Sequence, residues 1–387
     1  MRKRFYLFVV ILSCLVASCT PPKTEPIIQW PDVTEIEKLI DTAFGTAERN
    51  EKGTIVGVDL ARERASATDE VLKAALSLPS LKRFRFAGGS VAAESFADLT
   101  KQLALEELYL QDVPIRDAEW KSLLHGIPKL ARLTLRRLPN LSGAELGAIP
   151  QRFPMLRNLS LIEMELTGKS LTEIAESENI SALDVRHCSR LTAEDYRCLV
   201  SMKTLVDLKI GGFAVTDDVL AAITPLSSLR GLTIDDAQLA PEGFEKFVAE
   251  SASADKLETL VLSRNMSLFD DSLSSLKKFP CLQRLTVNGM MITGTFLERL
   301  AEAETTRPKL RQLSLRKAFL SDAGGAALKK YPELRVLDLS AVAATPELIA
   351  IVSSLNRLEE LDVTDCGLDE DSLQLLQTMS SLKRLRR

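Results

Sequence analysis

The side chains best suited to catalysis or metal binding are few in this chain of 387 residues, and they lie far apart. The two histidines are His125 and His187, and His187 is followed directly by Cys188. Adjacent side chains of an extended segment point to opposite faces, so this histidine is not expected to activate this cysteine as a nucleophile. We predict that neither histidine is catalytic and that His125 lies on a helix.

The cysteines also lack the spacing of a metal site or of a dense disulfide framework, because no CxxC pair occurs. Two of them lie in the N-terminal segment, and the other four are expected to be buried thiols that act as small hydrophobic side chains. In chain order the six cysteines are Cys14, Cys19, Cys188, Cys198, Cys281 and Cys366.

A phosphate-binding loop is suggested only by Gly168-Lys169-Ser170, and the first glycine that such a loop requires would fall at Glu163. We interpret Thr167 instead as the N-cap of a helix that starts at this point. No zinc-protease, serine-hydrolase or dinucleotide-binding motif occurs in the sequence. The sequence therefore predicts a protein with no enzymatic activity and no cofactor.

Residues 1–18 have the features of a secretory signal peptide. Three basic residues, at positions 2–4, precede an apolar run of thirteen residues from Phe5 to Ala17. A membrane-spanning helix needs about 20 apolar residues, so this run is too short to span a membrane. Its length and its basic start are typical of a signal that is removed after export.

Residues 16–19 (VASC) resemble the lipobox of bacterial lipoproteins, in which an aliphatic residue and two small residues precede a cysteine. The resemblance implies cleavage before Cys19, a diacylglycerol thioether on its sulfur, and acylation of its amine by a fatty acid such as palmitate. Residues 19–27 would then be a lipidated tether, since they are polar and proline-rich. Thr20 stands where aspartate is the usual inner-membrane signal, which implies an extracytoplasmic place in the cell envelope, at the outer membrane rather than the inner. A signal peptide without a lipid is the alternative.

The composition is that of a folded protein, with 45% hydrophobic and 26% charged residues. Aromatic residues make up only 5%, so aliphatic side chains must form the core. The formal net charge is −4, and loss of the three basic residues of the signal peptide would change it to −7. A net acidic chain is a poor candidate for binding nucleic acid.

One six-residue pattern recurs every 24 to 28 residues: apolar residues stand at its first, fourth and sixth positions. Fourteen such hexads in register are the signature of a solenoid. The alternation within each hexad predicts a short strand with one buried face, and the rest of each unit predicts a helix. The hexads begin at Ile55, Leu81, Leu105, Leu130, Leu156, Ile180, Leu205, Leu229, Leu257, Leu282, Leu310, Leu334, Leu358 and Leu382.

The hexads, their period and the helix after each strand resemble the leucine-rich repeat family. The resemblance spans residues 55–387, about thirteen repeats, and implies an α/β fold: a right-handed solenoid with a parallel sheet on its concave face and helices on its convex face. The ninth position carries Cys188 and Cys366 in two repeats, which is similar to the cysteine-containing subtype of F-box adaptors. Other residues stand at this position elsewhere, namely Val113, Leu138, Met164, Phe213, Asn265 and Met290.

Helix starts are marked by residues that favour N-caps. Ser142 and Glu145 have the spacing of a capping box, and Thr345 stands just before Pro346. We therefore expect helices to begin after Ser142 and after Thr345.

The two ends of the solenoid differ in sequence. Residues 28–54 include Trp30, Ile36, Leu39, Ile40 and Phe44, and are expected to form a helical N-terminal cap over the first strand. No such segment follows Leu382. The last strand carries basic residues that would discourage pairing of an open edge. The alternative is that a partner or a second copy covers this edge.

The third, fifth and seventh positions of each repeat are expected to face outward on the concave sheet, where neighbouring strands lie about 4.8 Å apart. Toward the N-terminus they form a patch rich in arginine and tyrosine, which are favoured in binding hot spots. Near the other end, Asp338, Glu360 and Asp362 form a smaller acidic zone. Ordinary solvated charge is the alternative for both. The predicted partner-binding residues are Arg83, Arg85, Glu107, Tyr109, Gln111, Arg132 and Arg136.

These observations predict a lipid-anchored protein of the cell envelope that binds a protein partner through its concave face and has no catalytic activity. Its contacts would be an unidentified protein, a membrane through Cys19, and possible further copies through the C-terminal edge. The alternatives are an intracellular F-box-like adaptor for ubiquitination and a structural envelope protein without a specific ligand.

Overall fold

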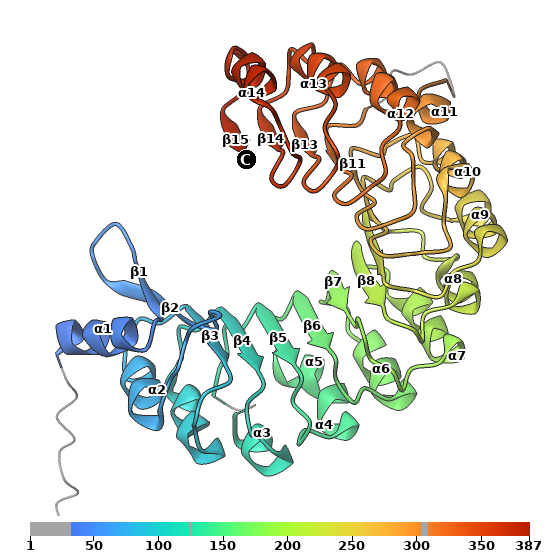
Figure 1. Ribbon diagram of the computed structural model, residues 1–387. Coiled ribbons are helices and arrows are strands. Elements are labelled where there is room, and N and C mark those ends of the chain that lie inside the picture. Colours follow the sequence, from blue (N-terminus) through green and yellow to red (C-terminus); the bar gives the residue numbers. More distant parts are fainter. Residues whose placement is uncertain (1–31, 124–125, 303–308) are drawn as a thin grey trace, which may run out of the picture.

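The computed structural model describes residues 32–123, 126–302 and 309–387. Within these residues fifteen strands form one open sheet in which the strands follow one another in chain order. Figure 1 shows the sheet bent into an arc, with the strands on its inner side and the helices on its outer side. The chain is therefore an α/β solenoid, as the repeats predict.

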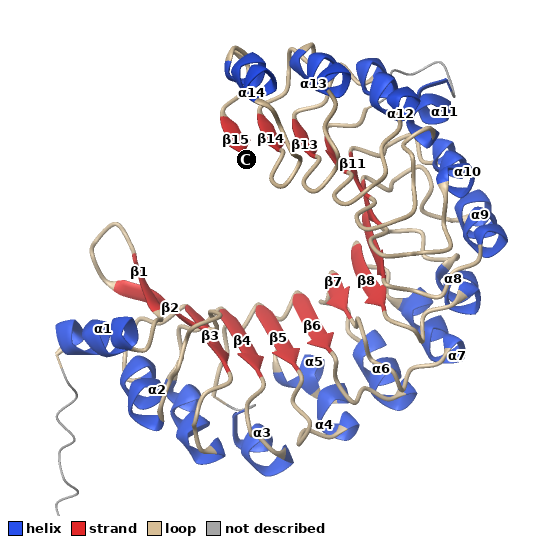
Figure 2. Ribbon diagram, viewed as in Figure 1, coloured by secondary structure: helices blue, strands red, loops and turns tan. Residues whose placement is uncertain are grey.

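The strands are short and mostly parallel (Figure 2). Each pairs with the next in register, as when Leu108 aligns with Leu133, and only β1 is antiparallel to its neighbour. The strands are β1 Thr46–Arg49, β2 Ile55–Leu60, β3 Arg83–Ala87, β4 Glu107–Gln111, β5 Arg132–Arg136, β6 Asn158–Ile162, β7 Ala182–Asp184, β8 Asp207–Gly211, β9 Gly231–Asp235, β10 Thr259–Val261, β11 Arg284–Thr286, β12 Gln312–Ser314, β13 Val336–Asp338, β14 Glu360–Asp362 and β15 Arg384–Arg386.

One continuous core runs along the solenoid between the strands and the helices. The fourth and sixth positions of every hexad from Ile55 to Leu358 are buried, as predicted; Leu135 and Leu339 are examples. Each repeat alone would leave these side chains in water, so stacking of neighbours supplies the burial that holds the fold together.

The helical half of most repeats is a short α-helix, a 3₁₀-helix or both. The α-helices are α1 Val33–Thr42, α2 Asp69–Leu76, α3 Asp117–Leu123, α4 Gly143–Gly147, α5 Ile149–Arg152, α6 Gly168–Ala175, α7 Ala193–Tyr196, α8 Asp217–Ile223, α9 Pro241–Glu250, α10 Asp270–Leu273, α11 Phe296–Glu302, α12 Asp322–Ala327, α13 Pro346–Ser353 and α14 Glu370–Gln377. The 3₁₀-helices are η1 Ala93–Lys101, η2 Arg197–Ser201, η3 Ser274–Lys278 and η4 Leu328–Lys330.

Two predicted helix caps form. The Thr345 hydroxyl accepts a hydrogen bond from the Leu348 N–H at 3.1 Å, at the start of α13. The Thr167 hydroxyl accepts one from the Ser170 N–H at 3.3 Å, at the start of α6. The Gly-Lys-Ser segment is therefore the first turn of a capped helix, as interpreted from the sequence.

The capping box predicted at Ser142 is wrong, although α4 does begin at Gly143. The Ser142 side chain makes no capping bond, and its backbone N–H donates to Asp117 of the preceding repeat at 2.8 Å. Glu145 pairs with Lys121 at 3.2 Å instead of reaching back to Ser142. Contacts with the preceding repeat thus engage the Ser142 N–H and the Glu145 carboxylate, the two groups that would bond to each other in a capping box.

The eighth position of each repeat from Leu81 to Leu358 has a left-handed backbone. Its non-glycine members have φ between 49° and 60°, in a region that most residues avoid. The N–H at this position donates to the seventh-position carbonyl of the next repeat, as when the Asp112 N–H donates to Arg136 at 3.1 Å. The eighth positions are Gly88, Asp112, Arg137, Glu163, His187, Gly212, Asp236, Arg264, Gly289, Lys317, Ala341 and Asp365.

The N-terminal cap differs from the helix expected over residues 28–54, because only α1 is helical among its described residues. The chain then turns at Phe44 and forms β1, which pairs antiparallel with β2 and covers the first edge of the sheet. Ile36 and Ile40 are buried as a cap requires, but Phe44 is 62% exposed. Trp30 lies outside the described residues.

Candidate functional site: the concave face

Cys188, the cysteine next to His187, is not placed for catalysis. Cys188 faces the core, where its thiol donates to the Leu161 carbonyl at 3.1 Å and burial raises its pKa to about 12. A thiol with so high a pKa is not a nucleophile at neutral pH. His125 lies outside the described residues, and within those described no group of histidine, cysteine or acidic side chains could hold a metal ion.

The four cysteines of the repeats are free thiols. Cys188 and Cys366 are buried as predicted, whereas Cys198 and Cys281 are only half-buried, so the prediction was wrong for those two. Among the residues that the structure describes, no helix is both long and apolar enough to cross a membrane.

At three ninth positions a polar side chain fastens its repeat to the one before it. The thiols of Cys188 and Cys366 both donate to the sixth-position carbonyl of the preceding repeat, the latter to Leu339 at 3.0 Å. Asn265 makes the same contact with Ile234 at 2.8 Å. It also donates to Leu262 and accepts the Ala237 N–H, so all three bonds lie in the core.

Phe213 departs from this rule, although its place in the repeat predicts a core residue. Its side chain is 74% exposed, and the side chain of Val215, two residues later, is buried in the core. The Val215 N–H donates to the Gly212 carbonyl at 2.9 Å, which closes a turn that carries Phe213 outward. In this repeat the ninth position therefore faces solvent.

We call the concave surface over β2–β6 the N-terminal arm and that over β10–β15 the C-terminal arm. On the N-terminal arm the predicted patch residues lie on neighbouring strands, and six of the seven are half-buried. Each arginine of the patch pairs with an acidic side chain, so the patch is electrically balanced rather than basic. The pairs are Arg83–Glu48, Arg85–Asp59 at 3.5 Å, Arg132–Glu107 at 3.1 Å and Arg136–Glu163 at 2.6 Å.

Tyr109 occupies the middle of this arm. The Arg85 guanidinium lies over its ring, 4.4 Å from the centroid, and its hydroxyl bonds to Gln111. The Gln111 amide donates in turn to Asp112 at 2.8 Å. These contacts order the arginine, tyrosine and glutamine side chains before any partner arrives.

Arg137, at a left-handed eighth position, joins this network at the edge of the arm. Its guanidinium binds Asp112 at 2.7 Å and Glu163 at 3.3 Å. The hydrogen bond from Arg137 lowers the pKa of Asp112. Burial alone would raise the pKa of Glu163, but the bonds from Arg136 and Arg137 outweigh it and the pKa is lowered. Both carboxylates therefore stay ionised at pH values below those at which aspartate and glutamate usually take up a proton.

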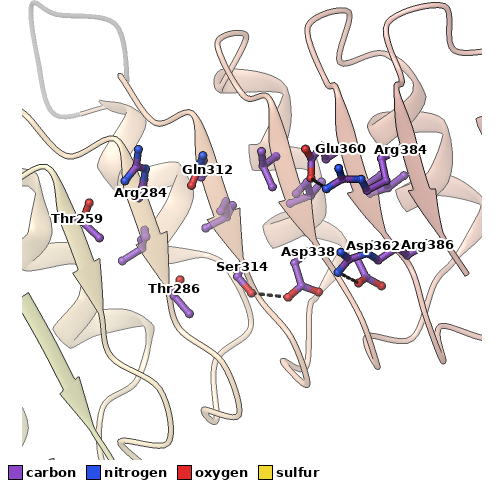
Figure 3. Close-up of a pocket in the computed structure, with 15 residues that line it drawn as sticks. Thr259, Arg284, Thr286, Gln312, Ser314, Asp338, Glu360, Asp362, Arg384 and Arg386 are labelled. Atoms are coloured by element: carbon purple, nitrogen blue, oxygen red, sulfur yellow. Dashed lines mark hydrogen bonds and ion pairs between the residues drawn. The ribbon is translucent and has the colours of Figure 1, made fainter. Parts of the chain in front are cut away.

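The C-terminal arm contains a hollow of about 320 Å³ (Figure 3). Its strands are three residues long, and small side chains such as Thr259, Thr286 and Ser314 line it. Figure 3 shows Arg284 and Gln312 on adjacent strands at the upper side of this surface. Arg284 is exposed and has no acidic partner among the described residues, unlike the arginines of the N-terminal arm.

The predicted acidic zone forms the far side of this hollow, and two of its three carboxylates are paired with arginines. Glu360 pairs with Arg384 at 2.9 Å and Asp362 with Arg386 at 3.7 Å. Asp338 accepts a hydrogen bond from the Ser314 hydroxyl at 2.8 Å. The basic side chains of β15 thus bind the preceding strand in addition to lining an open edge.

Each of the fourteen hexads forms one strand, β2 to β15, and Cys188 and Cys366 join their repeats to the preceding ones in the same way. The chain has the leucine-rich-repeat fold. No family model matches it. It is 26% identical over 248 residues to NLR family CARD domain-containing protein 4 of Rattus norvegicus, covering 61% of this chain and 24% of that protein. The chain therefore spans about a quarter of that relative's length.

Two solved structures resemble the leucine-rich-repeat solenoid over most of its length. An internalin (inlF) from Listeria monocytogenes has a TM-score of 0.42 and 17% identity, with 92% of this chain and 88% of that chain covered. A structure of the Rad7 and Elc1 complex in yeast has a TM-score of 0.48 and 18% identity, with 83% and 84% covered.

Sequence reasoning placed the patch residues of the leucine-rich-repeat sheet on one face but missed the hollow. A signal for it exists at the fifth position, which is Val261, Thr286 and Ser314 in the repeats from Leu257 to Leu310. The predicted lipidation at Cys19 lies outside the described residues, as does the tether over residues 19–27.

Proposed function

We propose that this protein is a non-catalytic scaffold whose concave face binds a protein partner. The hollow of the C-terminal arm is the observation that carries this proposal. It is the size of a small binding pocket and presents an unpaired arginine beside polar side chains. A carboxylate of the partner at Arg284 would complete the kind of ion pair that the other arm makes internally.

The patch on the N-terminal arm is the proposed second contact area. Its arginines and tyrosine are residues that dominate binding energy when they are buried in an interface. Because Arg85 and Tyr109 are already ordered by their neighbours, a partner would lose less side-chain entropy on binding them. Internal ion pairs do not prevent this use, since exposed pairs are weak and can exchange partners.

The patch is tested by replacing Arg132 and Arg136 with glutamate. We expect loss of partner capture by crosslinking in the native envelope, and an affinity for the identified partner at least about tenfold lower, because two attractive charges become repulsive. The matched control is Arg190→Glu with Arg197→Glu, which breaks ion pairs away from the concave face. If the control weakens binding equally, the patch has no specific role.

The hollow is tested by filling it with Thr286→Trp. A tryptophan there would occupy the space that a partner side chain needs, so we expect binding to weaken while the melting temperature stays close to that of the parent. Ser122→Trp on the convex helix α3 is the control for a bulky exposed substitution. Unchanged binding by Thr286→Trp would remove the hollow from the proposal.

Lipid attachment at Cys19 and a place in the bacterial cell envelope, at the outer membrane, are further parts of the proposal. They are supported by the resemblance of residues 16–19 to a lipobox. Labelled palmitate should enter the wild-type protein in a bacterial host but not Cys19→Ala. Equal labelling of the two proteins would refute the anchor and leave the concave-face proposal intact.

A further inference from the structure

Large apolar side chains gather in the loops that follow the strands. We call the edge of the solenoid formed by these loops the strand-exit rim. Phe319 is 65% exposed there, and Met266 and Met291 are each about half exposed. These three residues occupy the tenth position in three successive repeats, and the half-exposed Phe269 lies beside them in sequence.

Backbone hydrogen bonds hold the three loops side by side. The Arg264 N–H donates to Asn288 at 2.9 Å, the Gly289 N–H to Arg316 at 2.8 Å, and the Phe319 N–H to Ile292 at 3.0 Å. The three side chains therefore form one apolar patch rather than isolated exposures. Single exposed apolar residues need no explanation, but a contiguous patch marks a binding surface.

The opposite rim, where the chain enters the strands, provides a comparison. Leu103 and Met155 are as exposed as the residues of the patch. They lie in repeats that are separated by a third, so they do not adjoin. Exposed apolar side chains therefore occur in neighbouring repeats on the strand-exit rim, whereas Leu103 and Met155 on the opposite rim do not adjoin.

Cations flank the aromatic side chains of this rim. Arg316 and Lys317 precede Phe319, are exposed, and make no ion pair within the described ranges. Two nearby carboxylates are already engaged: Asp270 accepts the Thr293 N–H at 2.7 Å, and Asp271 pairs with Arg299, whereas Asp322 is exposed.

The same combination recurs at the N-terminal end of the rim. Phe44 is 62% exposed and is held outward by a left-handed backbone with φ 56°. It lines one surface depression with Arg62 and Arg64, neither of which is ion-paired in the described part of the chain, and with the acidic residues Asp41 and Glu63. The Ser66 N–H donates to the Ala43 carbonyl at 3.1 Å and fixes this turn beside the first repeat.

We propose that the strand-exit rim binds an anionic lipid surface. Phenylalanine and methionine side chains that protrude from a rim can enter the headgroup region, and arginine and lysine beside them attract acidic headgroups. An acidic peptide would share the charge preference, but protruding side chains fit a deformable surface better than a peptide that needs a groove. This binding goes beyond the concave-face function and does not require a lipid on Cys19.

The test is methionine oxidation by chloramine-T, a water-soluble anion, in the full chain with and without vesicles. Vesicles of equal parts phosphatidylcholine and phosphatidylglycerol should slow oxidation of Met266 and Met291 by roughly fivefold or more, because buried rim residues leave the water. Met155 on the opposite rim has similar exposure and serves as the internal control. Its oxidation rate should not change, whether or not the N-terminal segment also inserts.

Charge is tested by Arg316→Gln with Lys317→Gln, which should weaken the protection. Lys309→Gln with Arg311→Gln makes the same change at the other end of the same strand and should not. Equal slowing at Met155, or no slowing at Met266 and Met291, would overturn the proposal. Protection that needs no vesicles and grows with protein concentration would overturn it in favour of contact between two copies of the chain.

Discussion

The two arms of the concave face are built on one repeat yet present different surfaces. The N-terminal arm has strands of five or six residues covered by paired arginines and acids, and its first edge is closed by β1. The C-terminal arm has strands of three residues, small side chains and a hollow, and its last strand β15 has a neighbour on one side only. Since the core positions are the same in both, the fold leaves the outward positions free to vary. Binding properties can therefore change along the arc without loss of stability.

The largest predicted effect concerns how unfolding differs between the N-terminal and the C-terminal end of the solenoid. Leu135 and Leu339 hold the same sixth position and are equally buried. Replacing either with alanine should cost about 3 to 5 kcal/mol. Because repeats contact only their neighbours, we expect Leu339→Ala to unfold mainly the repeats near the open C-terminal end. Hydrogen exchange should then rise after about residue 310 while the N-terminal arm stays protected.

Leu135→Ala is the partner experiment, and it should raise exchange across the capped N-terminal arm instead. The comparison fails if both variants lose protection uniformly along the chain. Such a result would mean that the solenoid unfolds as a single cooperative unit and that its arms are not independent.

The next prediction concerns Asn265 at the start of the C-terminal arm. Its three buried hydrogen bonds predict that Asn265→Ala destabilises the protein by about 3 kcal/mol, because each bond contributes about 1 kcal/mol. Asn265→Cys should lose less, since Cys188 shows that a thiol can keep the bond to the preceding repeat. Urea unfolding of both variants measures this. A loss for Asn265→Ala no greater than that for Cys188→Ala would contradict it.

A stabilising change is predicted in the loops of the C-terminal arm. Ala341 has φ 56°, which costs an alanine about 1 kcal/mol relative to glycine. Ala341→Gly should therefore raise the melting temperature. Ala350→Gly is the matched control, because Ala350 is exposed in α13 and glycine in a helix destabilises by roughly 0.5 to 1 kcal/mol. Destabilisation by both substitutions would show that the left-handed turn carries no strain.

The sequence contained enough to predict the solenoid, because the apolar positions of the hexads decide which face of each strand is buried. It did not reveal the left-handed eighth position. Aspartate, arginine, histidine, lysine and alanine all occur there, so no side-chain type marks it. The outward direction of the patch residues was also predictable from alternation. The partner of Arg83 was not, because Glu48 lies on an antiparallel strand that the helical-cap prediction did not include.

The smallest predicted effect compares the charge networks of the two arms. The Arg137 guanidinium nitrogens lie 2.7 Å from an Asp112 carboxylate oxygen and 3.3 Å from one of Glu163. The contact between Arg386 and Asp362 is longer, with 3.7 Å between nitrogen and oxygen. These groups are partly exposed and screened, so Arg137→Met should cost about 0.5 kcal/mol at pH 7 and Arg386→Met less. Urea unfolding at several pH values measures both.

The pH dependence has a definite sign. The folded-state pKa values of Asp112, Glu163 and Asp362 are all lowered. A lowered pKa contributes stability above the unfolded value of about 4, and that contribution is lost as the pH falls through the folded value. The wild type and Arg137→Met should therefore converge in stability below about pH 4. If their difference persists in acid, packing of the Arg137 side chain rather than its charge holds the edge of the N-terminal arm, and the contrast between the arms is one of shape alone.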